Sequence, residues 1–421
     1  MADTTVDLTL DPSPASRGEN LTPDDLTPTP ARGYPSPKGN LTPGPSPKGR
    51  GENLSPDDFT PAPAHGYPSP EGNLTPSPSP KGRGEQEGKR KRLLSGMQPT
   101  GTGALHLGNL EGALRSWVRL QSEYEMFCCV VDWHALTTRA EESHKIAPAC
   151  REVAADYIAA GLDPDKCAIF IQSHVKEHAE LHLLLSMITP IGWLERVPTY
   201  KEKRELLQER GGSDETISYG LLGYPVLQAA DILAYRANAV PVGKDQAAHL
   251  EITREIGRRF NRLYGEVFPE PQSVFTEGAA TLPGVDGRKM SKSYGNAIYI
   301  GDSPEQIAEK VKSAFTTPTK IRKTDPGVPE NCAVCQLRRI YDPEGYRSSW
   351  DEDIAGERGC MQNKKELTEI LVAKLQPMRA HREMLLADPT ELERVLARGA
   401  DRARAVAAET MDLVRAAIGL R

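Results

Sequence analysis

The sequence predicts a chain of three parts: a disordered arm over residues 1–88, a doubly wound parallel α/β domain over 89–300 and an all-helical domain over 301–421. Two observations support the folded parts. Short apolar runs that are typical of buried strands alternate with helical patterns in the second part, whereas the third part shows apolar spacings of three and four. The residues after the arm, about 330, suffice for one α/β domain and one helical domain.

The first 88 residues contain a tandem duplication. Residues 18–21 (GENL) recur at 51–54, and residues 34–37 (YPSP) recur at 67–70, so both offsets are 33 residues. The segment is crowded with Pro, Gly, Ser and Thr and lacks apolar periodicity, so it cannot bury enough surface to offset its chain entropy. We therefore expect disorder, whether the arm is a proline-rich ligand for a partner domain or a translated genomic repeat.

The arm also carries most of the formal net charge of −6, because its twelve acidic and seven basic residues leave the rest of the chain near neutral. The acidic average therefore does not exclude a nucleic-acid partner. The N-terminus has no basic start followed by an apolar core, and no apolar run approaches the roughly 18 residues of a membrane span. We expect a cytoplasmic protein with no membrane segment.

The second part begins with its strongest local pattern, residues 93–112. Leu93 and Leu94 are typical of the end of a buried strand, residues 99–103 (PTGTG) of a tight loop, and residues 113–117 of a helix body. A strand, a glycine loop and a helix N-terminus together form a phosphate site, because unpaired N–H groups and the positive end of the helix dipole meet there. Glycines alone would equally fit a structural strand-to-helix turn.

The following elements continue the alternation of strand and helix. Residues 125–131 (EMFCCVV) predict a buried strand, 146–160 a helix closed by Gly161, and 168–172 a further strand. Residues 132–137 (DWHALT) follow the first of these strands. Ligands collect at the carboxyl ends of strands in open parallel sheets, so this segment is a candidate for binding.

A second motif, residues 289–293 (KMSKS), lies about 180 residues after His106-Leu107-Gly108-Asn109. Together the two resemble the HIGH and KMSKS signatures of the class I aminoacyl-tRNA synthetases. The resemblance implies a Rossmann-like, HUP-type catalytic domain that binds ATP with Mg²⁺. It also implies that His106 and helix-end amides contact the triphosphate, while two ammonium groups reach its β and γ phosphates.

Residues 224–233 (YPVLQAADIL) resemble the amino-acid pocket of the tryptophanyl and tyrosyl members. Asp231 stands among apolar neighbours, and a buried carboxylate must be paired, either by a structural Arg or by a donor on the ligand. We favour the ligand. An indole N–H and a phenol O–H could both donate to Asp231, but Leu94 stands where tyrosyl relatives tend to carry a Tyr, and an apolar wall suits an indole.

From Leu93 to its C-terminus the chain is similar to the bacterial tryptophanyl-tRNA synthetases, as residues 95–101, 132–137 and 240–243 also indicate. The resemblance implies ATP-dependent activation of L-tryptophan to tryptophanyl-adenylate and its transfer to tRNA(Trp), by a homodimer whose helical domain reads the anticodon. Two alternatives stay open. One is a tyrosyl-tRNA synthetase, and the other is a catalytically silent paralogue that binds RNA.

The family pattern implies the following site residues. The groups expected to act in catalysis are His106, Asn109, Lys203, Lys289 and Lys292. The expected ATP-binding set is Gln98, Thr100, Gly101, His106, Gly108, Asn109, Gly243, Asp245, Lys289, Met290, Ser291 and Lys292. The expected tryptophan-binding set is Leu94, Gln98, Tyr224, Gln228, Asp231, Val240, Val242 and Gln246.

Three features depart from that pattern. The loop before His106 is about two residues longer than usual, Lys244 replaces an acidic residue, and Gln228 stands where many relatives carry Met. Residues 201–204 (KEKR) with Gly211 and Gly212 predict a mobile charged loop, which in the family lies over the ATP phosphates.

Two sets of residues raise the question of a metal. His174, His178 and His182 are spaced four apart after Ser173, which we expect to cap their helix, but no Cys or carboxylate cluster completes a site. Some bacterial relatives bind an iron–sulfur cluster through four C-terminal cysteines. This chain keeps Cys332, Cys335 and Cys360 but carries Asn363 at the fourth position, so an iron–sulfur cluster or zinc is not expected.

The third part begins at residues 302–305 (DSPE), a helix start with Pro at its first position. Helices are predicted over 307–314, 364–383 and 390–420. This part is rich in arginine, and arginines on such a domain either form a solvated surface or contact RNA phosphates. The arginines in question are Arg379, Arg382, Arg394, Arg398, Arg402 and Arg404.

Overall fold

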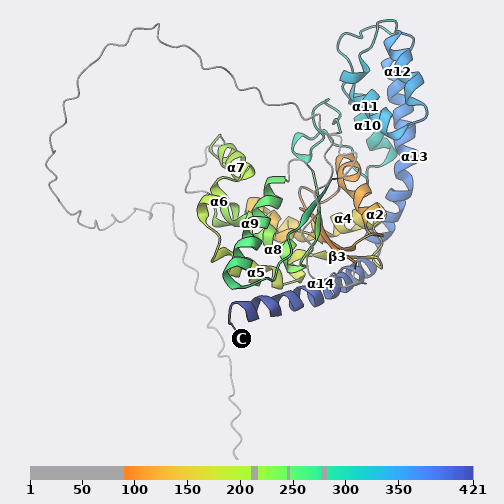
Figure 1. Ribbon diagram of the computed structural model, residues 1–421. Coiled ribbons are helices and arrows are strands. Elements are labelled where there is room, and N and C mark those ends of the chain that lie inside the picture. Colours follow the sequence, from red (N-terminus) through yellow and green to blue (C-terminus); the bar gives the residue numbers. More distant parts are fainter. Residues whose placement is uncertain (1–89, 210–216, 244–246, 276–281, 421) are drawn as a thin grey trace, which may run out of the picture. The chain divides into compact units, whose positions relative to one another are not determined.

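The computed structural model describes residues 90–209, 217–243, 247–275 and 282–420 (Figure 1). The disorder expected for residues 1–88 lies outside them. The described chain contains a five-stranded parallel sheet in the order β3-β2-β1-β4-β5, with helices around it and further helices at its C-terminal end. The strands are β1 Arg92–Met97, β2 Glu125–Val130, β3 Cys167–Ile171, β4 Ala239–Val242 and β5 Gln272–Phe275. The predicted fold class is confirmed.

The strand order reverses between β1 and β4, which pair through Leu93 and Ala239. Such a reversal leaves a crevice at the carboxyl ends of the two strands, where open α/β sheets bind their ligands. β1 is longer than the sequence suggested. It continues past Leu94 to Met97, because it pairs in register with β2 from Arg92 opposite Glu125 to Met97 opposite Val130.

The first helical segment, α1 Leu107–Asn109, continues through a π-helical turn, Leu110–Leu114, into α2 Arg115–Leu120. The predicted helices in the α/β part and at the C-terminal end are present, each within a few residues of its expected bounds. The other α-helices are α3 Asp132–Arg139, α4 Ile146–Ala159, α5 Glu177–Ser186, α6 Ile191–Glu195, α7 Pro198–Glu209, α8 Tyr219–Ala234, α9 Ala247–Tyr264, α10 Pro304–Ser313, α11 Ala333–Tyr341, α12 Tyr346–Ile354, α13 Cys360–Ala387 and α14 Pro389–Ala417.

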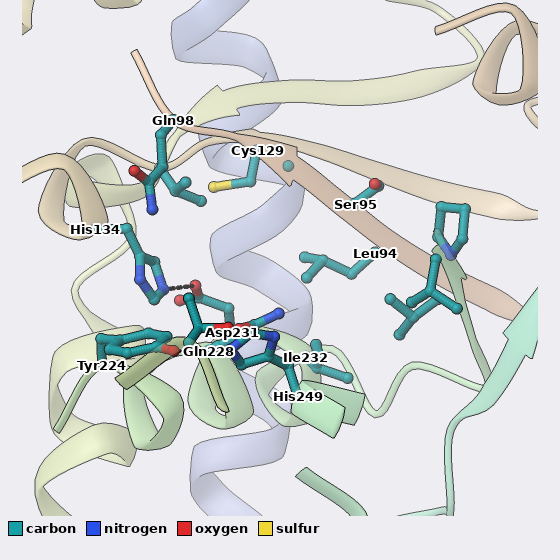
Figure 2. Close-up of a pocket in the computed structure, with 16 residues that line it drawn as sticks. Leu94, Ser95, Gln98, Cys129, His134, Tyr224, Gln228, Asp231, Ile232 and His249 are labelled. Carbon is teal, nitrogen blue, oxygen red and sulfur yellow. Dashed lines mark hydrogen bonds and ion pairs between the residues drawn. The ribbon is translucent and has the colours of Figure 1, made fainter. Parts of the chain in front are cut away.

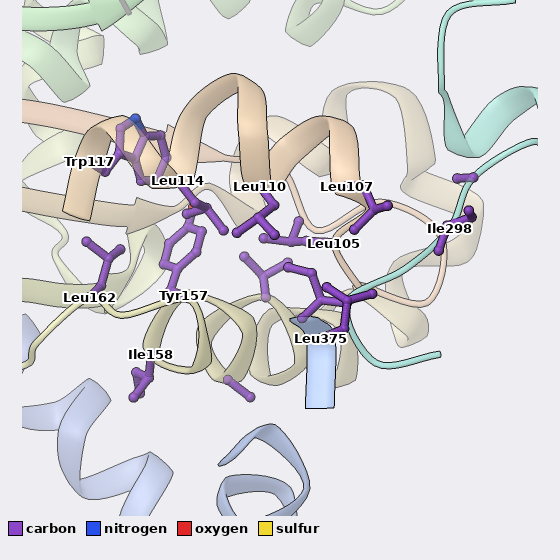
Figure 3. Close-up of a cluster of buried hydrophobic side chains, with 14 of the residues drawn as sticks. Leu105, Leu107, Leu110, Leu114, Trp117, Tyr157, Ile158, Leu162, Ile298 and Leu375 are labelled. Atoms are coloured by element: carbon purple, nitrogen blue, oxygen red, sulfur yellow. The ribbon is translucent and has the colours of Figure 1, made fainter. Parts of the chain in front are cut away.

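Apolar side chains fill both faces of the sheet. On one face, the row Leu107, Leu110 and Leu114 packs onto α4 near Tyr157, and Leu375 from α13 lies in the same cluster (Figure 3). This cluster therefore packs the segment after β1 against α4 and α13. Each of these side chains is almost fully buried.

α14 packs against the edge strand β3. The approach is close because position 399 is a glycine: a Cβ there would come within 1.9 Å of the Ile169 carbonyl oxygen. Arg402 fixes the same contact by donating to the carbonyls of Pro164 (3.0 Å) and Cys167 (3.1 Å). Within the described part of the chain, no helix is long and apolar enough to span a membrane.

Candidate active site

A cavity of about 320 Å³ opens at the crevice between β1 and β4 (Figure 2). Every residue that the sequence assigned to tryptophan binding and that the structure describes lines this cavity. These residues are Leu94, Gln98, Tyr224, Gln228, Asp231, Val240 and Val242. Gln246 lies outside the described residues. Nine further lining residues in the described part of the chain were not in the predicted tryptophan-binding set: Ser95, Gly96, Cys129, Val131, His134, Thr199, Ile232, Pro241 and His249.

Among the described residues that line this cavity, Asp231 is the only carboxylate, and its side chain is 4% exposed. The expectation of an arginine or a ligand as its partner was incomplete. The carboxylate accepts hydrogen bonds from His134 Nε2 (3.0 Å) and His178 Nδ1 (2.6 Å), and Gln172 Nε2 lies 2.7 and 2.9 Å from its two oxygens. Behind it, His178 Nε2 lies 2.6 Å from the Tyr235 hydroxyl.

Burial alone would raise the pKa of Asp231, but the hydrogen bonds from His134 and His178 outweigh it and hold the pKa well below its usual range. The side chain is therefore an ionised carboxylate that can only accept hydrogen bonds. Its two oxygens already meet donors from three side chains, so a substrate N–H must share an oxygen with one of them. His134 makes the longest bond and also lines the cavity.

The three histidines spaced four apart do not share a helix. α5 begins at Glu177 with Lys176 as its N-cap, so the cap predicted at Ser173 is wrong, and His174 lies in a separate 3₁₀ turn. His178 is fully buried against Asp231 and Tyr235. Its partner is a carboxylate on α8, 53 residues further along the chain.

A second cavity, of about 790 Å³, lies beside the first motif. It joins residues of both sequence motifs, and Gln98 lines it as well as the first cavity. Its lining includes these members of the predicted ATP-binding set: Gln98, Thr100, Gly101, His106, Asn109, Ser291 and Lys292. Thr138 and Arg139 also line it and were not predicted.

His106 is the N-cap of α1. Its Nδ1 accepts the Asn109 backbone N–H (3.3 Å), and the Asn109 side chain accepts the His106 N–H (3.1 Å), which completes a capping box. Burial, and then the charges of Lys292 and Lys289, lower the pKa of His106 to about 4. The ring is therefore neutral at pH 7, and since Nδ1 accepts, the proton lies on Nε2.

Lys292 of the second motif is hydrogen-bonded to the loop that precedes the first motif. Its Nζ donates to the carbonyls of Thr100 (3.1 Å) and Gly103 (3.3 Å). Burial is the main reason that its pKa falls to about 8. The loop that accepts these bonds is held against α4, because Gly103 has φ +93° and a Cβ there would come within 2.4 Å of the Ala149 carbonyl oxygen.

The other predicted ATP-binding residues have different surroundings. Lys289 is exposed and is not among the residues that line this cavity, whereas Met290 is buried in the core. Gly108 lies against the His106 ring. Gly243 follows β4 without lining either cavity described above, and Asp245 lies outside the described residues.

The loop predicted at residues 201–204 is wrong, because these residues belong to α7. The charged residues there are also good helix formers, and that propensity decides the local structure. Of the Lys203 side chain nothing is described, and Gly211 and Gly212 lie outside the described residues.

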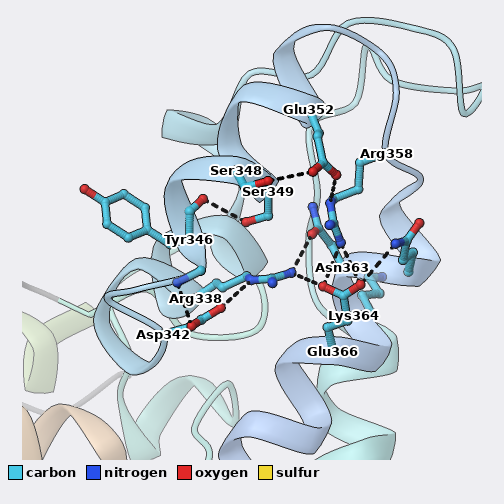
Figure 4. A network of polar contacts seen from close by, with 12 residues as sticks. Arg338, Asp342, Tyr346, Ser348, Ser349, Glu352, Arg358, Asn363, Lys364 and Glu366 are labelled. Carbon is cyan, nitrogen blue, oxygen red and sulfur yellow. Dashed lines mark hydrogen bonds and ion pairs between the residues drawn. The ribbon is translucent and has the colours of Figure 1, made fainter.

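Cys332 and Cys335 occupy the start of α11, where Cys332 Sγ accepts the Cys335 N–H (3.3 Å). Asn363 is held by Arg338, which donates to its side-chain oxygen (3.1 Å), within a network that also includes Glu366 and Arg358 (Figure 4). Across residues 90–209, 217–243, 247–275 and 282–420, no group of three or more His, Cys, Asp or Glu side chains is arranged to hold a metal ion.

Each of the arginines singled out in the helical part has a partner within the chain. Arg379 donates to the Asp302 carbonyl, and Arg382 pairs with Asp156 of α4. Arg398 pairs with Asp165. Arg402 and Arg404 donate to carbonyls next to β3, and Arg394 pairs with Glu391.

The parallel sheet and the two motifs, which meet at one cavity that shares Gln98 with the Asp231 cavity, define a class I synthetase site, and comparison with known proteins agrees. Residues 86–376 match the family described as tRNA synthetases class I (W and Y). The tryptophan–tRNA ligase of Thermotoga maritima is 47% identical over 332 residues, covering 78% of this chain and 99% of that protein. That of Aquifex aeolicus is 42% identical over 396 residues, covering 78% and 100%.

A solved structure gives the same result. The tryptophanyl-tRNA synthetase from Campylobacter jejuni complexed with ADP and tryptophan matches with a TM-score of 0.70 and 36% identity, covering 78% of this chain and 99% of that one. The chain therefore belongs to the class I tRNA synthetases of the tryptophan and tyrosine group and, within it, to the tryptophan–tRNA ligases.

Proposed function

We propose that this protein activates L-tryptophan with ATP to tryptophanyl-adenylate and transfers the acyl group to tRNA(Trp). One observation carries the proposal: the cavity around Asp231 and the cavity around His106 and Lys292 share Gln98. An amino acid whose side chain lies near Asp231 would then direct its carboxylate toward the phosphates. The relative from C. jejuni with ADP and tryptophan supports this pair of ligands.

In the first step, the tryptophan carboxylate attacks the α phosphate of ATP in line, which forms the adenylate and releases pyrophosphate. The reaction needs no side-chain nucleophile, so positioning and charge stabilisation supply the rate. Magnesium enters with ATP as part of the substrate. We assign to neutral His106 an Nε2–H donor role and to Lys292 an ammonium that exchanges the loop carbonyls for phosphate oxygens.

The amino-acid cavity favours an indole. Leu94, Val240 and Val242 supply apolar walls, and Asp231 supplies a hydrogen-bond acceptor that stays ionised. A site built to accept a hydrogen bond rejects an analogue without the donor far more strongly than an apolar pocket rejects a misfit. We therefore expect the site to bind and activate phenylalanine far more weakly than tryptophan. We assign the selection against tyrosine to the apolar walls.

The remaining roles rest on membership of the family. We propose that residues 301–421 include the region that reads the anticodon, that Lys203, Lys289, Gly243, Asp245 and Gln246 complete the site, and that the protein is a cytoplasmic homodimer. Four apolar side chains on or next to α5, α6 and α8 are candidates for the dimer contact, because Leu183, Met187, Ile191 and Tyr219 are 54%, 71%, 61% and 65% exposed. A Met187→Glu variant that stays dimeric by light scattering would exclude this contact.

The test of the reaction is ATP–pyrophosphate exchange by the full-length chain, with tryptophan and tyrosine compared at equal concentrations. Exchange with tryptophan alone, followed by charging of tRNA(Trp), is the expected result. Exchange that prefers tyrosine would instead indicate a tyrosyl enzyme. RNA binding without exchange of either amino acid would indicate the silent paralogue.

A further inference from the structure

The loop before His106 is hydrogen-bonded to α4, and α4 is in turn paired with the C-terminal helix α13. Directly before His106, the Leu105 backbone N–H donates to Asp156 Oδ2 at 2.6 Å. Asp156 belongs to α4 and is completely buried. Its other oxygen, Oδ1, accepts from Arg382 Nε of α13 at 2.7 Å. One carboxylate thus joins α13 to the backbone of the first motif.

Arg382 is held tightly in this arrangement. Its side chain is 12% exposed and also pairs with Glu152, one turn before Asp156 on α4. The guanidinium lies beside Gly301, where a Cβ would come within 3.0 Å of it. Arg382 therefore contacts both α4 and the segment that follows the KMSKS motif.

That segment pairs with the other side of the first motif. The Leu105 carbonyl accepts the Ile300 N–H (2.9 Å), and the Leu107 N–H donates to the Ile298 carbonyl (2.9 Å). His106 lies between these two bonds, so its backbone is fixed on one side by residues 298–300 and on the other by Asp156. Burial raises the pKa of Asp156 to about 6 even though Arg382 and the Leu105 N–H both lower it, so the carboxylate depends on its partners.

A second arginine of α13 acts on the same segment. Arg379, three residues before Arg382 and so on the same side of the helix, donates to the Asp302 carbonyl (3.3 Å). Asp302 Oδ2 accepts the Tyr299 N–H (2.7 Å), and Tyr299 forms a β-bridge with His106. Both arginines therefore reach the residues around His106 through one intervening carboxylate residue.

We infer that Arg382 is a positioning residue for ATP: acting through Asp156, it sets the backbone at Leu105 and thereby the His106 side chain and the first N–H groups of α1 relative to the triphosphate. The inference rests on the proposed function and adds to it a contribution from the C-terminal helix. Displacement of a binding group by about 1 Å can lower the rate about a hundredfold. A loosened loop should therefore weaken the binding of ATP more than the binding of tryptophan.

The alternative is that Arg382 only stabilises the fold. The chain offers a matched control in Arg415, which pairs with Glu180 through two hydrogen bonds (2.8 and 2.6 Å) and joins α14 to α5. Both are arginine–carboxylate pairs between a C-terminal helix and the α/β part, but Asp156 also accepts the Leu105 N–H of the first motif, whereas Glu180 belongs to α5. Arg382→Gln and Arg415→Gln thus each remove an arginine–carboxylate pair, and because the Arg415 pair is more exposed (33% and 41%, against 12% and 0%), urea unfolding is used to compare the two losses of stability.

The experiment compares full-length wild type, Arg382→Gln, Arg382→Lys and Arg415→Gln. It measures the KM for ATP and for tryptophan in pyrophosphate exchange, the Kd of ATP by equilibrium dialysis, and urea unfolding. We expect Arg382→Gln to raise the KM and Kd for ATP roughly tenfold or more with little change in the KM for tryptophan, and Arg382→Lys to recover part of the loss. Arg415→Gln is expected to leave both KM values unchanged.

The double variant Arg382→Gln with Asp156→Asn adds a second criterion. If the two residues act as one unit, its loss of ATP affinity is smaller than the product of the two single losses. An unchanged KM and Kd for ATP in Arg382→Gln, or equal increases for ATP and tryptophan, would overturn the inference. A wild-type chain that binds ATP without exchange would refute the proposed function alone, and one that binds no ATP would refute both.

Discussion

Replacing His178 by Leu tests whether the buried network behind Asp231 prepares the amino-acid site. The change removes the 2.6 Å bond to the carboxylate and leaves the Tyr235 hydroxyl, which is fully buried, without its partner. Loss of a hydrogen bond to a buried charged group costs about 1.5–3 kcal/mol, and a buried hydroxyl left without its partner costs about 1–3 kcal/mol more. Since a domain is stable by about 5–15 kcal/mol, the variant should fold but unfold at clearly lower urea.

The effect on function should be specific. With one donor fewer, the burial that raises the pKa of Asp231 is opposed only by His134 and Gln172, so the carboxylate becomes less firmly ionised and less firmly placed. We expect the Kd for tryptophan to rise roughly tenfold or more, as removal of about 1.4 kcal/mol of binding energy would give, while the Kd for ATP stays within twofold.

Tyr235→Phe is the milder companion, because it removes only the hydroxyl behind His178 and should cost about 1 kcal/mol. Urea unfolding and isothermal titration with tryptophan and with ATP measure both variants. If His178→Leu is destabilised as expected but binds tryptophan with unchanged affinity, the network serves only the fold. In that case the reasoning from Asp231 to specificity is refuted.

Three further predictions follow from the site and the fold. Lys292→Met should lower the exchange rate by roughly 10²–10³ with unchanged tryptophan affinity, and equal losses in rate and in tryptophan binding would exclude a role in the transition state. The variant should lose no stability at pH 7. Folding lowers the pKa of Lys292 from 10.5 to about 8, so the charged side chain disfavours the folded state at pH 7 and the free energy of unfolding rises with pH between these two values. His106→Asn should be slow but keep the wild-type shape of the pH–rate profile between pH 5 and 7.5, since His106 with a pKa of about 4 does not titrate there; loss of a step would show that it does. Gly399→Val should destabilise the chain by at least roughly 1–3 kcal/mol in urea unfolding, because its Cβ would meet the Ile169 carbonyl; unchanged stability would mean that α14 can move away from β3.

The sequence was sufficient for three of the five described strands and for much of the site, since local patterns determine both, but β4 and β5 were not predicted. The apolar runs at 125–131 and 168–172 became β2 and β3, and the two motifs led to residues that line one cavity. The C-terminal end of β1 could not be predicted from the local sequence. The pairing of Met97 with Val130 extends it, and that pairing depends on a strand about 30 residues away.

The partners of Asp231 could not be predicted for a similar reason. His134, Gln172 and His178 come from three separate segments that meet only when the sheet and α5 are assembled. A signal was present, because His134 follows a strand whose carboxyl end faces the crevice. The error at residues 201–204 differs in kind: charge was taken as a sign of a loop, although Lys, Glu and Arg all favour a helix.

His106 and Asp231 show how one physical effect gives opposite protonation states in adjoining cavities. Burial disfavours charge on both. At His106 the neighbouring lysines act in the same direction, so the ring stays neutral and can donate one hydrogen bond to an anion without carrying a charge of its own. At Asp231 donors from His134 and His178 overcome burial, so the carboxylate stays charged and can accept an indole N–H. Because the neighbours decide each state, we expect residues behind the cavities, such as His178, to affect the reaction as well as the residues that line them.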